Sequence, residues 1–137
     1  MNSPKTDTPT LVREGEQLNV ANLNAYFATQ LPDFGDITEV SQFPGGYSNL
    51  TYFLKTTHQK EYVLRRPPFG AKHIKGGHDM GREFRVLSML HKAGYPKIPQ
   101  PVIYCDDESV LDCPFYVMQR VKGVILRAHT APKMGIE

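Results

Sequence analysis

One stretch, Phe43-Pro44-Gly45-Gly46-Tyr47-Ser48-Asn49-Leu50-Thr51, separates two segments that have the composition of β-strands. Its adjacent glycines allow positive φ angles and a close approach of the backbone to a ligand. Backbone N–H groups, with the side chains of Ser48 and Asn49, can donate hydrogen bonds to phosphate oxygens. The stretch lacks the GK[ST] ending of a Walker A loop, and no helix follows it directly. A phosphate-binding turn and an ordinary hairpin turn are both open at this point.

The segments around this turn predict a three-stranded antiparallel meander. Residues 37–42 alternate weakly between apolar and polar, as in an edge strand, and residues 50–54 are rich in β-branched and aromatic side chains. A short polar turn at 58–60 leads into a further strand at 61–65.

Two helices and two more strands are expected outside the meander. Apolar residues spaced three and four apart predict a helix from its N-cap, Asn19, to Pro32. After a loop at 67–78 rich in glycine and proline, a second helix is expected from Asp79 to Gly94. Strands are expected at 102–105 and 115–120, with an acidic turn between them. The predicted fold class is α+β: a five-stranded antiparallel sheet with one packed helix and an extra N-terminal helix.

Composition argues against a nucleic-acid-binding function. The chain has 137 residues, which suits one domain, and its 16 basic and 14 acidic residues give a net charge of only +2. Nucleic-acid surfaces are usually strongly basic, so no nucleic-acid partner is expected. An anion or nucleic-acid contact through the basic residues between Arg65 and Lys75 is a weaker alternative.

The N-terminus and the cysteines give no sign of export. Residues 1–17 are polar and contain two prolines, which predicts a mobile leader rather than a signal peptide. No stretch reaches the roughly 20 apolar residues that span a bilayer, so no membrane contact is expected and the expected compartment is the cytoplasm. Cys105 and Cys113 lack zinc-site spacing, which favours two reduced thiols.

Two charged residues could act together on a phosphate. Arg65 ends the third expected strand, where a guanidinium can grip phosphate oxygens in a bidentate manner. Glu83 lies near the start of the second helix, about 100° around the helix axis from the sheet-facing Phe84, and could orient Arg65. The alternatives are a solvated charge at a strand end and a carboxylate that stabilises the helix dipole.

The last strand runs into a polar segment and Gly123, where a backbone leaving the sheet could present N–H and C=O groups to the edge of adenine. A core strand with a simple turn is the alternative. A glycine turn, a basic residue on the third strand, a helical glutamate and then a strand with a hinge is the order typical of a protein-kinase-like N-lobe.

From about Phe43 to Leu126 the chain resembles the aminoglycoside phosphotransferase and choline kinase-like family. It is most similar to the branch whose kinase domains are fused to acyl-CoA dehydrogenases. The resemblance rests on four motifs: Gly45-Gly46-Tyr47-Ser48-Asn49-Leu50-Thr51-Tyr52, Tyr62-Val63-Leu64-Arg65-Arg66-Pro67-Pro68, Arg82-Glu83-Phe84-Arg85-Val86-Leu87 and Tyr116-Val117-Met118-Gln119-Arg120-Val121-Lys122-Gly123.

The resemblance implies a protein-kinase-like N-lobe with a nucleotide site. Arg65 would stand in the place of the lysine that grips the α- and β-phosphates, which keeps the charge but changes the reach. The implied nucleotide-binding residues are Gly45, Gly46, Tyr47, Ser48 and Asn49 in the loop, Arg65 and its partner Glu83, Met118 behind the adenine, and Gln119 and Val121 through their backbone groups.

The family's catalytic His-x-Asp motif and its downstream magnesium-binding aspartate do not occur in this sequence. No residue is therefore assigned as a catalytic base or a metal ligand. The expected organisation is a flexible leader at 1–17, the N-lobe at 18–126, and the hinge exit with the start of a second lobe at 127–137.

The resemblance implies an ATP-dependent O-phosphotransferase, a small-molecule kinase. A full-length form would use ATP with magnesium and a small hydroxylated acceptor such as an acyl-CoA derivative. We expect these 137 residues alone to be catalytically inactive. The alternative is a non-catalytic module that binds a nucleotide or a protein partner.

Overall fold

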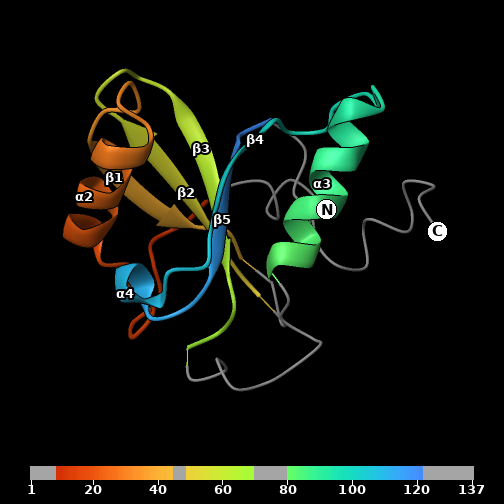
Figure 1. Ribbon diagram of the computed structural model, residues 1–137. Helices are drawn as coiled ribbons and strands as arrows, with labels where there is room; N and C mark the ends of the chain where they lie inside the picture. Colours follow the sequence, from red (N-terminus) through yellow and green to blue (C-terminus); the bar gives the residue numbers. More distant parts are fainter. Residues whose placement is uncertain (1–8, 45–48, 70–79, 122–137) are drawn as a thin grey trace.

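Five antiparallel strands form one sheet in the order β1-β2-β3-β5-β4 (Figure 1). The structure is a computed structural model that describes residues 9–44, 49–69 and 80–121. The elements are α2 (Val20–Gln30), β1 (Ile37–Gln42), β2 (Leu50–Thr56), β3 (Glu61–Arg66), α3 (Met80–Lys92), β4 (Pro101–Cys105), α4 (Glu108–Leu111) and β5 (Phe115–Gln119). The predicted α+β class, with five antiparallel strands, is confirmed. The short helix α4, which lies partly in the expected acidic turn, was not predicted.

The β1–β2–β3 meander forms through a tight turn at the end of β2. The backbone N–H of Gln59 donates to the carbonyl of Thr56 at 2.9 Å, and Gln59 itself has a positive φ of 64°. This places the β2–β3 turn where the polar segment 58–60 predicts it.

Strand β5 enters the sheet between β3 and β4 and antiparallel to both. In this register Tyr116 lies opposite Arg65, and Met118 lies opposite Val63. The chain reaches β4 through α3 before it turns back, so residues far apart in the sequence become neighbours on adjacent strands.

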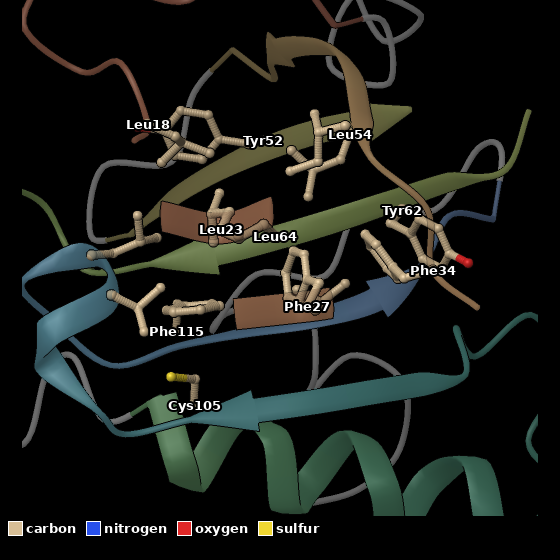
Figure 2. Packing of buried hydrophobic residues seen from close by; sticks show 14 of the residues in the cluster. Leu18, Leu23, Phe27, Phe34, Tyr52, Leu54, Tyr62, Leu64, Cys105 and Phe115 are labelled. Atoms are coloured by element: carbon tan, nitrogen blue, oxygen red, sulfur yellow. The ribbon is translucent and has the colours of Figure 1, made fainter. Parts of the chain in front are cut away.

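Alternation along β3 gives the sheet two covered faces. On one face Tyr62 and Leu64 join a cluster with Leu23 and Phe27 of α2 (Figure 2). On the other face Val63 joins a cluster with residues of α3, among them Leu87. The two helices therefore lie on opposite sides of the sheet, as Figure 1 shows.

Helix α2 begins as the sequence predicts. The side chain of Asn19 accepts a hydrogen bond from the backbone N–H of Asn22 at 3.0 Å, which satisfies one of the free N–H groups of the first turn. The helix ends before Leu31 and Pro32. Phe27 is completely buried, and its ring centroid lies 4.4 Å from that of Phe34.

Residues 10–16 make specific contacts with the outer edge of β1. Thr10 and Gln42 exchange two backbone hydrogen bonds of 2.7 Å each. The buried side chain of Gln42 accepts from the backbone N–H of Arg13 and donates to Glu16, both at 2.8 Å. The sequence predicts a mobile leader over residues 1–17, so these contacts were not expected. Residues 1–8 lie outside the described residues.

Both cysteines are buried and unpaired. Burial is the main cause that raises the pKa of the Cys113 thiol to about 11, so this group stays protonated near neutral pH. Within 9–44, 49–69 and 80–121, no three His, Cys, Asp or Glu side chains gather as a metal site would require. The same residues contain no helix with the length and apolar character needed to cross a bilayer.

Candidate nucleotide-binding site

Arg65 and Glu83 form a bidentate ion pair between β3 and α3. The Arg65 Nε atom lies 2.8 Å from Glu83 Oε1, and Nη2 lies 3.1 Å from Oε2. Planar guanidinium and carboxylate groups match in this side-on geometry, which fixes both side chains more firmly than a single contact would. The structure thus brings together the two charged residues that the sequence singles out.

The Glu83 carboxylate is a hub for four hydrogen bonds. Besides Arg65, the Tyr116 hydroxyl donates to Oε1 at 2.9 Å, and Asn49 Nδ2 donates to Oε2 at 2.7 Å. Each oxygen therefore accepts twice, which uses the roughly four acceptor positions that a carboxylate offers. One carboxylate links the residue before β2 with β3, α3 and β5.

Arg65 is a buried cation that makes a third hydrogen bond, to Thr51. Its Nη1 donates to Thr51 Oγ1 at 2.7 Å, and its side chain is only 3% exposed, against 22% for Glu83. Burial acts to lower the pKa of Arg65, but Tyr116 and Glu83 more than offset this, so the pKa is raised and the guanidinium stays charged. Nη1 and Nη2 each carry a second N–H, and the Tyr116 hydroxyl is a further hydrogen-bonding neighbour of the guanidinium.

Tyr116 acts as a donor in this network. Burial is the largest cause that raises its pKa; Arg65 opposes the shift and Glu83 adds to it. The phenol therefore stays protonated at physiological pH and can donate its O–H to the carboxylate.

The residues that the resemblance assigns to the base lie at the end of β5. Met118 is buried beside Val63 on the same face as Tyr116. The backbone N–H of Gln119 donates to the Gln100 carbonyl at 2.9 Å, so of its two backbone groups the carbonyl is the one left for the expected adenine contact, which stays a prediction. The N–H is taken because the chain just before β4 continues alongside β5. Val121 follows β5 and is partly exposed.

Arg120 lies on the α3 face of the sheet, against Phe43 and Phe53, and the sequence predicted no role for it. Its guanidinium carbon lies 5.4 Å from the ring centroid of Phe43 and 5.3 Å from that of Phe53, within the range of cation–π attraction. Its Nη1 lies 3.7 Å from Glu61 Oε1.

Several predicted residues lie outside the described parts of the chain. They are Gly45, Gly46, Tyr47 and Ser48 of the glycine turn, the loop at 70–78, the expected N-cap Asp79, and the hinge exit at 127–137. Asn49 is thus the described end of the predicted nucleotide loop.

The network also contains two residues that sequence reasoning missed, Thr51 and Tyr116. Thr51 lies opposite Arg65 on β2, and Tyr116 lies opposite Arg65 on β5. The hairpin register alone could have identified Thr51. Tyr116 required knowing that β5, rather than β4, pairs with β3.

Comparisons with known proteins show which family has a similar sequence. A model of the phosphotransferase enzyme family matches residues 39–135. The chain is 40% identical over 118 residues to human acyl-CoA dehydrogenase family member 11, covering 83% of this chain and 15% of that protein. It is 37% identical over 128 residues to the same family member from Gallus gallus, covering 90% of this chain and 16% of that protein. The chain therefore spans only about a sixth of the length of these curated relatives.

A solved structure supports the same assignment. A Ralstonia eutropha JMP134 protein described as an aminoglycoside phosphotransferase superposes with a TM-score of 0.57 and 33% sequence identity, over 81% of this chain and 30% of its own. The fold is therefore shared with a kinase-like protein, and the family match covers most of the described strands. The chain belongs to the phosphotransferase enzyme family.

Proposed function

We propose that this chain forms the nucleotide-binding lobe of an ATP-dependent O-phosphotransferase that acts on a small hydroxylated molecule. The observation that carries the proposal is the Glu83 carboxylate, which holds the buried cation Arg65 and Asn49 of the glycine turn at one point. A fixed positive group beside a glycine turn is suited to binding polyphosphate.

The proposed chemistry divides between binding and transfer. Phosphoryl transfer depends mainly on positioning and on neutralising the charge of the phosphates. Arg65 would neutralise the α- and β-phosphates through the second N–H groups of Nη1 and Nη2, while Met118 would lie behind the base. Magnesium would supply further positive charge next to the phosphates, with ligands from outside the residues described here.

The sequence carries neither the family's His-x-Asp motif nor its magnesium-binding aspartate, so we propose that the 137 residues alone bind nucleotide without turnover. The acceptor in a longer form would be a hydroxylated acyl-CoA derivative. The similarity to acyl-CoA dehydrogenase family members supports this choice. We place the protein in the cytoplasm as part of the same proposal.

The direct test of the proposal is titration of the isotope-labelled chain with adenosine and with ADP, followed by NMR. We expect ADP to shift the signals of Asn49 and Arg65, and adenosine to shift those near Met118. Shifts confined to residues away from this site, or no shifts at millimolar ligand, would contradict the proposal and favour the partner-binding alternative.

Replacing Arg65 by methionine should weaken ADP binding by about 10-fold or more, because a charge-assisted hydrogen bond contributes about 1.5–3 kcal/mol. Adenosine binding should not change. Arg65→Lys should restore part of the ADP affinity, since it keeps the charge but loses the bidentate contact. Arg85→Met, which removes the same charge from an exposed position on α3, is the matched control. Equal losses in Arg65→Met and Arg85→Met would show only a general effect of charge.

A further inference from the structure

Tyr116 contacts Glu83 directly, and the sequence assigns it no role. Its ring lies on the α3 face of the sheet and is 1% exposed, with its centroid 5.6 Å from that of Phe84. A phenylalanine would fill the same volume among these side chains. The hydroxyl is what distinguishes tyrosine here, and it donates to Glu83 Oε1 at 2.9 Å.

The position of this bond determines what it can do. Arg65 takes one acceptor position on each oxygen of Glu83, through Nε on Oε1 and Nη2 on Oε2. Tyr116 takes the second position on Oε1, and Asn49 takes the second position on Oε2. Each carboxylate oxygen therefore accepts one hydrogen bond from the guanidinium and one from a neutral donor. The two neutral donors, Tyr116 and Asn49, hold the carboxylate in place from its two oxygens.

A carboxylate needs such support, because rotation about its terminal bond is soft and has broad energy wells. Without the Tyr116 bond, Glu83 could turn one oxygen toward solvent, since its side chain is 22% exposed. Arg65 would then lose the side-on partner that sets the plane of its guanidinium. The two remaining N–H groups, which are fixed in that plane, would no longer keep one direction.

We propose that Tyr116 is a positioning residue that locks the Glu83 carboxylate in the plane of the Arg65 guanidinium and so aims Arg65 at the nucleotide phosphates. The inference rests on the proposed function, since it assigns Tyr116 to the phosphate half of that site. Tyr116 acts through Glu83 and through its own contact with Arg65, and it touches no phosphate itself. Its burial and its protonated state suit it to a permanent donor role.

The test is Tyr116→Phe in the 137-residue chain, titrated with ADP and with adenosine. We expect ADP to bind about 5-fold more weakly, as the loss of one hydrogen bond near 1 kcal/mol would produce, and adenosine to bind unchanged. Tyr62→Phe removes the hydroxyl of another core tyrosine, one on the opposite face of the sheet, and serves as the control, with both affinities unchanged.

A ligand-independent readout keeps the inference testable if the variant is less stable. The Arg65 Nε–H proton should exchange with water several-fold faster in Tyr116→Phe than in the unmodified chain or in Tyr62→Phe. Equal weakening of ADP and adenosine with unchanged exchange would mean a merely structural role and overturn the inference. If the unmodified chain binds neither ligand, the proposed function itself fails. If it binds ADP and Tyr116→Phe binds it equally well, only the role of Tyr116 is wrong.

Discussion

Replacing Glu83 by glutamine is expected to lower the free energy of unfolding by about 3 kcal/mol. Breaking one side of a buried ion pair costs about 3–5 kcal/mol, and the lower end applies because Glu83 keeps 22% of its side chain exposed. The buried Arg65 would lose its counter-charge. The amide nitrogen of glutamine would also face a donor, either Tyr116 or Asn49, where the carboxylate had accepted.

Urea unfolding followed by circular dichroism gives this free energy directly. Glu39→Gln makes the same chemical change at an exposed position on β1 and should alter stability by no more than about 0.5 kcal/mol. If Glu83→Gln cost as little as Glu39→Gln, the carboxylate would not hold the network together.

Replacing Phe27 by alanine is expected to cost about 3–5 kcal/mol, as large deletions from a core do. Phe27 has no exposed surface and contacts Phe34, which in turn stacks on Tyr62 of β3 at a centroid distance of 4.4 Å. This chain of rings joins α2 to the sheet. Helix α2 precedes residues 39–135, so the experiment asks whether a helix outside the family match is part of the core.

Thermal and urea unfolding of Phe27→Ala should show the loss, with Gln30→Ala as the control on the exposed end of the same helix. A cost below about 1 kcal/mol, the usual size for a modest mutation, would mean that α2 packs only loosely on the sheet.

Local patterns predicted most of the secondary structure. The asparagine cap of α2, the polar β2–β3 turn and the strand character of residues 50–54 depend on neighbours in the sequence, so they could be recognised before the fold was known. Helix α4 was not predicted because it has only four residues. In the sequence, its N-cap Asp107 is part of what reads as an ordinary acidic turn.

The rest of the site depends on contacts between distant parts of the chain. The motif order pairs Arg65 with Glu83, but Tyr116 reaches Glu83 only because β5 inserts beside β3. Strand order is decided by how the whole sheet packs, which local propensity does not report. The same holds for Gln100, which takes the N–H of Gln119 only because the chain before β4 runs beside β5.

Polar composition was also a poor guide near the N-terminus. Residues 10–16 have the character of a disordered segment, yet a single buried amide, that of Gln42, binds Arg13 and Glu16. One well-placed partner in the folded domain can recruit a polar segment that composition alone would leave unstructured.

The insertion of β5 between β3 and β4 also affects how the chain can fold while it is being made. On the ribosome, β1, β2 and β3 emerge first and can pair at once, but the free edge of β3 must wait until residues 115–119 appear. At about 5–20 residues per second this wait is on the order of several seconds. During it a nascent chain presents an open strand edge, which invites pairing with another chain. Of the five strands described here, the last to be synthesised is an interior one, and the hydrogen-bond network around Glu83 cannot be complete before Tyr116 arrives.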